Sequence, residues 1–471
     1  MKVNRRTFLG GAAALASLSA SSAHAGRQVD LVAAPGEAGL VVPDGPATKA
    51  WLYNGTAPGP VLRARQGEEL KVDFKNQLPE PTTVHWHGLR VPVEMDGVPF
   101  LSQPPVAPGE SFTYRLQLED AGTFWYHPHV NSSEQVGRGL YGLLIIEELP
   151  EAAARLGADR EVAWAIDDWR LDDDAQIAPF GSFREMSHAG RIGNVLTVNG
   201  TYLTNTELRA GERIRLRLAN VANAQTFYLK FAPFDPWLVA LDGHPVPPRR
   251  LGEDGLWLGA AQRADLVLDV DLDPGETAKV IDEAYGADRA FEVMTWTVGD
   301  AAPIRTDSLP PPQMLPPNPI RRPDLSTAAE HRLALEGGAM SGMTGAMMGG
   351  KMIGMRELAQ AGKMWALNGA VPADIYKDPR LFQFDLGRTQ IIALENKTRW
   401  AHPIHLHGHS FHVLKDGEDP LAGAEIRDTV LLLPQESARI AFVADNPGKW
   451  MLHCHVLEHQ AAGMMGVVEV S

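Results

Sequence analysis

The only cysteine of this 471-residue chain, Cys454, stands between two histidines. An internal disulfide is excluded because there is no second cysteine, which leaves an inert thiol, an intermolecular link or a metal ligand. His459 and Met464 follow, each after four intervening residues, so one short segment offers a thiolate, an imidazole and a thioether. With a further imidazole from His402, this is the set of two histidines, one cysteine and a weakly bound methionine that is typical of blue copper sites.

Histidines gather in four short clusters along the chain. In a β-strand, residues i and i+2 point to the same face of the sheet and residue i+1 points to the other. Each cluster contains an H-x-H pair, so the paired imidazoles could meet at one site if the first and last parts of the chain pack together. Cys454 would then face the opposite side of its strand and belong to a second site. The paired histidines are His85, His87, His127, His129, His405, His407, His453 and His455.

Copper is the metal that fits both groups of side chains best. Imidazole suits copper, which binds such ligands more tightly than the other divalent first-row metals do. Zinc also binds cysteine and histidine, but it would not need the thioether of Met464. A single H-x-H pair is more often incidental than ligating, whereas four pairs in one chain are not a coincidence. We assign five other histidines to ordinary packing: His188, His244, His331, His409 and His412.

Weak internal repeats predict the elements that must position these side chains. An Asn-Gly pair closes a short apolar segment three times, at Asn54, Asn199 and Asn368, and an alternating apolar strand that ends in asparagine follows each. Alternation with a period of two, bounded by Gly, Pro and Asn, is typical of sandwich strands. Three such repeats predict an all-β chain of three β-sandwiches in series. We place them at residues 26–150, 151–300 and 329–471, with the four clusters confined to the first and third.

Composition also marks the connections between the repeats. The stretch Ala301–Asp324 contains eight prolines, so residues 301–328 are predicted to form an extended linker and not a packed element. Helices should be short and few, and Pro150–Leu156 is one candidate.

The first 25 residues differ from the rest of the chain. A pair of arginines, Arg5 and Arg6, precedes a weakly apolar run that ends at Ala23-His24-Ala25. This order predicts a cleavable export signal of the twin-arginine type and a periplasmic location. The apolar run is too short and too rich in serine for a membrane anchor. The formal net charge of −15 argues against binding to nucleic acid or to an anionic membrane surface.

The four motifs H-x-H-G, H-x-H, H-x-x-H-x-H and H-C-H-x3-H-x4-M together resemble those of three-domain multicopper oxidases, in particular bacterial laccases and copper-efflux oxidases. The resemblance covers essentially all of the chain after residue 25 and implies three cupredoxin-like Greek-key sandwiches. It also implies four copper ions per chain and no other cofactor. The implied ligands are His402, Cys454, His459 and Met464 for type 1 copper, His85 and His405 for type 2 copper, and His87, His127, His129, His407, His453 and His455 for the type 3 pair.

The activity that this resemblance implies couples four one-electron oxidations to the reduction of O₂ to water. Electrons would leave the type 1 site through Cys454, and an axial Met464 should give that site a lower potential than Leu or Phe would. Asp96 matches an acidic position that the family places near the trinuclear site, so it is a candidate proton relay. A plain turn residue in an Asp-Gly pair is an equal alternative. Many relatives carry an acid directly after the last type 1 histidine, and this acid serves a second route for protons. This chain has Gln460 at that position, so we do not predict the second route for it.

The segment Gly337–Met355 bears on the identity of the electron donor. It contains six methionines and seven glycines, with the methionines at a spacing close to helical. Such methionines could pack on the body of the protein or lie in a flexible loop. Exposed thioethers also select Cu(I), and we favour this interpretation, since copper-efflux oxidases resemble this chain in having a methionine-rich insert near the type 1 site. The candidate Cu(I) residues are Met340, Met343, Met347, Met348, Met352 and Met355.

Three alternatives differ in the donor or in the chemistry. A laccase that oxidises small phenols would need an open pocket at the type 1 site. A copper-storage protein would not turn over, and the complete ligand set argues against it. A two-domain nitrite reductase would lack the paired type 3 histidines. We expect a monomer whose reactants are O₂ and either Cu(I) or a small aromatic donor.

Overall fold

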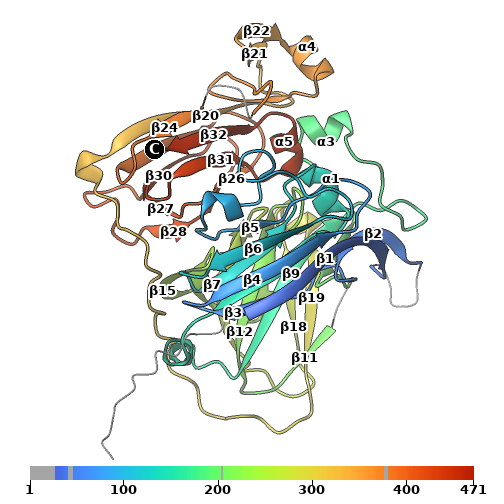
Figure 1. Cartoon of the computed structure of the whole chain (residues 1–471). Helices are drawn as coiled ribbons and strands as arrows, with labels where there is room; N and C mark the ends of the chain where they lie inside the picture. Colours follow the sequence, from blue (N-terminus) through green and yellow to red (C-terminus); the bar gives the residue numbers. More distant parts are fainter. Residues whose placement is uncertain (1–26, 41–45, 203–204, 376–379) are drawn as a thin grey trace, which may run out of the picture.

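The structure, a computed structural model, describes residues 27–40, 46–202, 205–375 and 380–471. Within these ranges most regular structure is β-strand, and six larger sheets form three pairs that follow one another along the chain (Figure 1). The inward-facing apolar residues of each pair form a core of their own. The predicted all-β fold of three sandwiches in series is therefore confirmed. The predicted export signal, residues 1–25, lies outside the described ranges.

The first sandwich contains two four-stranded sheets. In spatial order, one sheet consists of β2 (Thr48–Tyr53), β1 (Arg27–Ala38), β4 (Glu69–Asn76) and β6 (Ser111–Gln117). The other consists of β3 (Leu62–Arg65), β8 (Gly142–Glu147), β7 (Gly122–His127) and β5 (His85–His87). Because β5 and β7 are neighbours, the first two histidine clusters lie side by side.

The second sandwich contains a six-stranded and a five-stranded sheet. The larger sheet consists of β10 (Val195–Val198), β9 (Arg160–Trp169), β12 (Arg213–Asn220), β17 (Arg263–Asp269), β14 (Trp237–Leu241) and β15 (His244–Arg250). The smaller sheet consists of β11 (Asn205–Leu208), β19 (Phe291–Val298), β18 (Thr277–Asp282), β13 (Phe227–Ala232) and β16 (Leu256–Leu258). None of the four histidine clusters lies in this sandwich.

The third sandwich also pairs six strands with five. The larger sheet consists of β23 (Trp365–Leu367), β20 (Ala329–Gly337), β25 (Thr389–Asn396), β30 (Ser437–Val443), β27 (Phe411–Val413) and β28 (Glu425–Arg427). The smaller sheet consists of β24 (Phe382–Phe384), β32 (Met465–Val470), β31 (Gly448–Cys454), β26 (His402–Leu406) and β29 (Thr429–Leu432). Strands β26 and β31 are neighbours and carry the last two clusters. The residue boundaries near 150, 300 and 328 stay predictions.

The three Asn-Gly repeats form one structural device that recurs in each sandwich. Asn54, Asn199 and Asn368 adopt φ angles of 51°, 52° and 50°, a left-handed conformation that asparagine tolerates better than most residues. Each side chain bonds to the backbone of the neighbouring strand. Asn199, for example, accepts from the amide of Ala165 and donates to the carbonyl of Ala163, both at 2.9 Å. The equivalent bonds exist at the other two positions.

The asparagines that end the repeated strands have a second shared role. Asn76, Asn220 and Asn396 are buried, and each donates to backbone carbonyls later in its own sandwich while accepting from the amide two residues later. These bonds satisfy backbone groups that would otherwise be buried without partners where a strand turns into a loop.

Helices are short, as expected. The predicted helix at Pro150–Leu156 is present as α2 (Pro150–Ala153) followed by the 3₁₀ turn η2 (Ala154–Leu156), with proline at the favoured first position. No helix among the described residues is long and apolar enough to cross a membrane. The other short helices and turns are α1 (Ser132–Gly137), α3 (Phe183–Ser187), α4 (Met355–Gln360), α5 (Leu457–Ala461), η1 (Val93–Met95), η3 (Ala287–Arg289) and η4 (Leu325–Thr327).

The proline-rich segment between β19 and β20 contains no strand, as predicted. The prediction that it does not pack is wrong at two points. Leu315 is buried against Val239 and Val267 of the second sandwich. Asn318 bonds to both the amide and the carbonyl of Ala121 at 2.9 Å, so it pairs backbone groups of the first sandwich.

The methionine-rich segment is mainly a hairpin, so the helical spacing of its methionines was misleading. Strands β21 (Gly345–Met348) and β22 (Lys351–Gly354) pair in an antiparallel register, and only Met355 belongs to the helix α4 that follows. The turn is made by Gly349 and Gly350, whose φ angles of 56° and 76° suit a two-residue hairpin connection. The hairpin and α4 project from the body of the protein above the third sandwich (Figure 1).

Candidate metal centres

Two pairs of antiparallel strands bring the four histidine clusters to one place. In the first sandwich His85 lies opposite His127 across β5 and β7. In the third sandwich His405 lies opposite His453 across β26 and β31, and Ile404 lies opposite Cys454. The register therefore places the cysteine on the other side of β31 from its two histidine neighbours, as the alternation of a strand requires.

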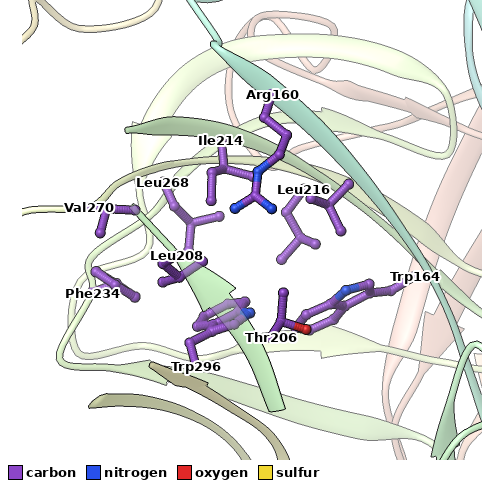
Figure 2. Close-up of a pocket in the computed structure, with 11 residues that line it drawn as sticks. Arg160, Trp164, Thr206, Leu208, Ile214, Leu216, Phe234, Leu268, Val270 and Trp296 are labelled. Atoms are coloured by element: carbon purple, nitrogen blue, oxygen red, sulfur yellow. The ribbon is translucent and has the colours of Figure 1, made fainter. Parts of the chain in front are cut away.

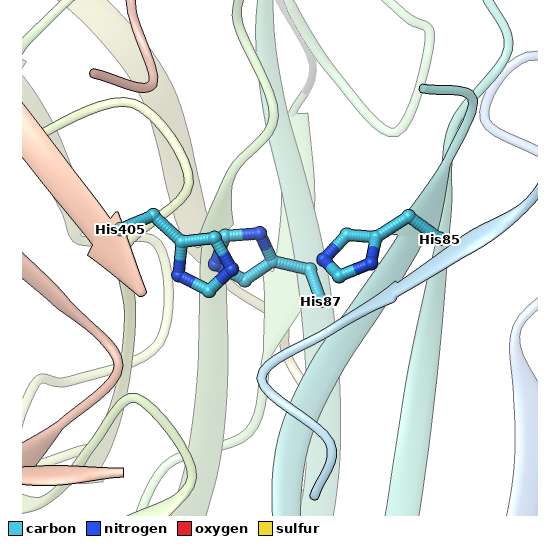
Figure 3. A group of neighbouring side chains, drawn as sticks. All are labelled: His85, His87 and His405. Carbon is cyan, nitrogen blue, oxygen red and sulfur yellow. The ribbon is translucent and has the colours of Figure 1, made fainter. Parts of the chain in front are cut away.

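The eight paired imidazoles are all buried and converge between the first and third sandwiches. His85 and His405 form one group with His87, and Figure 3 shows these rings turned toward one another. The rings of His87 and His405 stack with centroids 3.8 Å apart. The other rings complete two triads, in each of which the ligand atoms lie within 4.8 Å of one another: His87, His127 and His455, and His129, His407 and His453.

Most of these rings are held through one nitrogen and leave the other free. His85 donates from Nδ1 to the carbonyl oxygen of Asp96 at 2.7 Å, and His405 donates from Nδ1 to that of Asp428 at 2.9 Å. Buried polar atoms normally have partners, so unpartnered ring nitrogens that face one another fit a bound cation such as copper. The buried nitrogens without a partner include His85 Nε2, His87 Nδ1, His127 Nε2, His129 Nε2, His405 Nε2 and both nitrogens of His455.

Electrostatics favour neutral rings at this site. Burial lowers the pKa of His127, His129 and His455 well below the ordinary value, and the neighbouring imidazoles lower it further. A neutral imidazole keeps a lone pair for a metal, whereas eight imidazolium ions could not be buried together. The cluster is thus prepared for metal binding at neutral pH.

The second cluster lies on the other face of β31. The Sγ atom of Cys454 is 3.4 Å from Nδ1 of His402 and 3.7 Å from Nδ1 of His459, and these two nitrogens are 3.1 Å apart. Each ring is held through Nε2. His402 contacts the hydroxyl of Thr398 at 2.8 Å, and His459 donates to the carbonyl of His188 at 2.6 Å. All three ligand atoms therefore point at one another.

The thiol and the thioether are shielded from water. Burial raises the pKa of Cys454 well above its ordinary value, so a bound cation is needed to hold it as a thiolate. Met464 is fully buried in the same apolar core, and its carbonyl accepts from the amide of Cys454 at 3.0 Å. Between them the chain forms the helix α5, which carries His459.

Asp96 lies directly behind two of the rings. Its Oδ2 accepts from Nδ1 of His407 at 2.9 Å, and its Oδ1 lies 3.3 Å from Nδ1 of His85. The residue also forms the predicted turn. Gly97, at φ 81°, lies so close to the carbonyl of Val84 that no side chain would fit there. Both interpretations of Asp96 from the sequence are therefore compatible with its surroundings.

A second buried carboxylate, Asp428, contacts the cluster and was not found from the sequence. Its Oδ1 accepts from Nε2 of His87 at 3.0 Å, and its carbonyl accepts from Nδ1 of His405. Asp428 precedes β29 in a stretch without histidine, so no motif marked it. Only the pairing of β29 with β26 brings it to the rings.

The two residues that flank His459 make contacts away from both clusters. Glu458 is buried, but its carboxylate accepts from the side chain of Asn223 at 2.9 Å and from the amide of Arg191 at 3.0 Å. Gln460 donates weakly to the sulfur of Met451. The described contacts therefore give Glu458 a role in tying α5 to the second sandwich.

Three of the histidines outside the clusters have structural surroundings. The rings of His188, His244 and His331 each contact a polar side chain, Ser187, Ser410 and Gln390 respectively.

A small cavity lies in the second sandwich (Figure 2). It has a volume of about 10 Å³, room for about one water, between largely apolar walls that include Trp164 and Trp296. We assign it to imperfect core packing.

Comparison with known proteins agrees with this geometry. Two family models described as multicopper oxidase match residues 37–151 and 352–471. The multicopper oxidase MmcO of Mycobacterium tuberculosis is 30% identical, over 96% of this chain and 89% of its own length.

Solved structures extend the likeness to the fold. A multi-copper oxidase from Pseudomonas thermotolerans is 38% identical with a TM-score of 0.79, over 94% of this chain and 99% of that one. A multicopper oxidase from Campylobacter jejuni, described as a metallo-oxidase, is 27% identical with a TM-score of 0.77, over 94% and 91% of the two chains. The chain therefore belongs to the multicopper oxidase family, whose laccase-like members bind copper and oxidise a donor with O₂.

Proposed function

We propose that this protein is an exported cuprous oxidase that transfers electrons from Cu(I) to O₂ and serves copper tolerance. The observation that carries the choice of donor is a set of exposed thioethers in the methionine-rich segment, whose first residues lie against the candidate type 1 site. We propose that the chain holds four copper ions: type 1 with His402, Cys454, His459 and Met464, type 2 with His85 and His405, and the type 3 pair with His87, His127, His129, His407, His453 and His455.

Copper, when bound, supplies the one-electron chemistry that the reduction of O₂ by four donor electrons requires. The chain supplies the spacing between the two clusters. Cys454 presents its thiol to one cluster, while the rings of His453 and His455 belong to the other. The covalent path between the clusters thus runs along three consecutive residues, and we assign electron transfer to this path.

Oxygen reduction also consumes protons, and we assign their delivery to Asp96. Its carboxylate is buried and contacts the rings of His85 and His407. The Oδ1 atom has no hydrogen-bond partner, so it can hold a proton without breaking an existing bond. The role of Asp96 as a turn residue does not use this atom.

The methionines of the segment Gly337–Met355 form an inner and an outer set. Met343, Met348 and Met355 pack against a small core that includes Ala346 and Leu358. The outer set is exposed, with Met340 and Met352 each 71% and Met347 39% accessible to solvent. We propose that the outer set binds Cu(I), because thioethers prefer this soft ion and apolar packing does not account for their exposure.

The first residues of this segment lie against the type 1 cluster. The ring of Trp365 leaves no space for a side chain at Gly338, and the same ring packs on His459 with centroids 4.1 Å apart. The next residue, Ala339, donates to the carbonyl of Ser187 at 2.7 Å and accepts from the indole of Trp400 at 3.2 Å. The residues that lead into the hairpin and the end of α3 therefore lie against the two tryptophans beside the type 1 cluster, which favours a small ion over a bulky phenol as donor.

The triple variant Met340→Leu, Met347→Leu and Met352→Leu tests the donor. Leucine keeps the apolar bulk but removes the sulfur, so we expect kcat/KM for Cu(I) to fall by about tenfold, equivalent to about 1.4 kcal/mol. Turnover of ferrocyanide, which needs no thioether, should not change. The matched control is Met314→Leu, since Met314 is 40% exposed but lies in the linker.

The outcomes separate the donor from the family chemistry. Unchanged Cu(I) kinetics in the triple variant would contradict the cuprous oxidase role. If the wild-type protein oxidised a simple phenol faster than it oxidises Cu(I), the laccase alternative would be favoured. Export and copper tolerance are tested in cells. We expect Arg5→Lys with Arg6→Lys to retain the protein in the cytoplasm and to abolish complementation of a copper-sensitive strain.

A further inference from the structure

We propose that Arg263, in the second sandwich, is a positioning residue for His405, the proposed type 2 ligand, and His87, a proposed type 3 ligand, and acts on both rings through Asp428. The inference rests on the proposed assignment of His405 to type 2 copper. It gives the second sandwich, which contains none of the histidine clusters, a direct part in the geometry of the trinuclear site.

Arg263 begins β17 and is completely buried. All five of its guanidinium N–H groups have acceptors. Nε donates to the carbonyl of Thr123 at 3.1 Å, and Nη1 and Nη2 donate to the carbonyls of Ala261 and Asp242 at 3.2 and 3.0 Å. The remaining two donate to Oδ1 and Oδ2 of Asp428 at 2.8 and 2.5 Å. One side chain thus bonds to all three sandwiches, and the planar fork matches both oxygens of the carboxylate.

Asp428, which Arg263 holds in place, contacts both of the stacked rings. The Oδ1 atom that accepts from Arg263 also accepts from Nε2 of His87 at 3.0 Å and from the hydroxyl of Thr429 at 2.8 Å. Its carbonyl accepts from Nδ1 of His405 at 2.9 Å. These bonds leave Nδ1 of His87 and Nε2 of His405 as the nitrogens without partners. Asp428 therefore helps to orient one ring of the first sandwich and one ring of the third.

The fourth position of the H-x-H-G motif leaves room for this arrangement. A side-chain carbon at Gly88 would lie 2.5 Å from Nη2 of Arg263 and 2.6 Å from Oδ2 of Asp428. The backbone beside His87 must therefore approach the ion pair more closely than any other residue would allow. The motif and the pair fit one another sterically, although they come from three different parts of the chain.

A second buried arginine, Arg217, serves as a control that separates positioning of the rings from structural support of the interface. Arg217 lies on β12, beside β17, and is equally buried. It pairs with Asp265 at 3.0 Å and also contacts Thr123, but among the described residues it bonds to no cluster histidine and not to Asp428. A variant of Arg217 thus perturbs the same interface without acting on the rings.

The experiment compares Arg263→Lys with Arg217→Lys in the copper-loaded protein. Lysine keeps the positive charge but cannot hold both oxygens of Asp428 in a planar fork. We expect Arg263→Lys to keep a blue absorption band of normal intensity while its copper content falls from four ions per chain toward three. The type 2 EPR signal should weaken or change its hyperfine splitting. Arg217→Lys should lower the thermal unfolding temperature but leave both readouts unchanged.

A full copper content with an unchanged type 2 signal in Arg263→Lys would overturn the proposal, as would an equal loss in Arg217→Lys. If Arg263→Lys does not fold, Asp428→Asn takes its place, since it keeps the shape of the side chain and removes the charge on which the arginine acts. An unchanged type 2 signal in Asp428→Asn would likewise overturn the proposal. A wild-type protein that binds no type 2 copper at all would instead refute the site assignment itself.

Discussion

At the residue scale, the contacts of one ring nitrogen decide which nitrogen remains for a metal. His85 and His405 are held through Nδ1 and leave Nε2, whereas His87 is held through Nε2 and leaves Nδ1. In the second cluster both histidines are held through Nε2. Because backbone carbonyls and buried side chains make these contacts, the free nitrogens already point at one another before metal binds.

The proposed proton role of Asp96 leads to a prediction about two half-reactions. Asp96→Asn keeps the shape of the side chain but cannot hold a proton at Oδ1. We expect O₂ consumption to fall by about 10²- to 10⁴-fold. Anaerobic bleaching of the blue band by a reductant should proceed at the normal rate. Stopped-flow absorption measures bleaching and reoxidation separately. A lower unfolding temperature with normal reoxidation would leave Asp96 with the turn role alone.

The buried Asp167 of β9 leads to a prediction about pH. Burial and the neighbouring carboxylate of Asp168 raise the pKa of Asp167 to about 8. An unfolded aspartate ionises near pH 4, so between these values the folded protein holds a proton that the unfolded chain releases. This contribution to stability is present at low pH and is lost as the pH rises toward 8, by up to about 1.4 kcal/mol per unit.

Asp167→Asn removes that proton equilibrium. We expect the free energy of unfolding to fall less steeply from about pH 5 to about pH 8 in the variant than in the wild type. Denaturant titrations at several pH values measure the difference. Asp173→Asn, at an exposed position nearby, is the control and should follow the wild-type profile. Parallel profiles for wild type and Asp167→Asn would contradict the prediction.

At the scale of elements, the same asparagines recur where strands must meet loops. Asn220 ends β12 and donates to the carbonyls of Gln225 and Leu258 at 2.7 and 2.8 Å, and it is fully buried. Asn199 makes similar bonds at an exposed turn. The sequence repeats thus reflect repeated backbone hydrogen bonding, and burial distinguishes the strand-end asparagines from the Asn-Gly asparagines.

The two asparagines therefore differ in what their loss costs. Asn220→Ala leaves two buried carbonyls unpaired, and we expect it to lower the free energy of unfolding by about 2 to 5 kcal/mol. Asn199→Ala exposes its partners to water and should cost about 1 to 2 kcal/mol, mainly from left-handed backbone strain. Urea titration of both variants gives the comparison. Equal losses would show that burial of these bonds does not matter.

At the scale of the whole molecule, the candidate trinuclear site joins two sandwiches that are far apart in the sequence. Strands β5 and β7 supply rings from one side, and β26 and β31 supply them from the other. Metal that binds only the folded arrangement stabilises it by mass action. Copper should therefore tie the first sandwich to the third.

Removal of copper tests this link. A reductant with a chelator should lower the unfolding temperature, and at a free copper concentration of about 1,000 times Kd the bound state gains about 4 kcal/mol. Hydrogen exchange should speed up in β5, β7, β26 and β31 more than in the second sandwich. If copper removal increased the exchange rate equally in all three sandwiches, copper would not be what ties the first sandwich to the third.

The fold and most of the candidate ligands followed from the sequence because they depend on local periodicity. The alternation of a strand already assigns His453 and His455 to one face and Cys454 to the other, and the structure has this arrangement. Strand ends, asparagine turns and the short helix after Leu149 are equally local features. Their signals lie within a few neighbouring residues.

The tertiary structure alone decided which distant groups meet these rings. Asp428 and Arg263 carry no recognisable spacing, and their contacts with His87 and with each other join residues hundreds of positions apart. The methionine segment formed a hairpin because two glycines with positive φ make its turn, despite the helical spacing of its sulfur atoms. Local backbone preference determined which side chains face together, but only packing determined what lies behind them, since a buried charge can take its partner from any part of the chain.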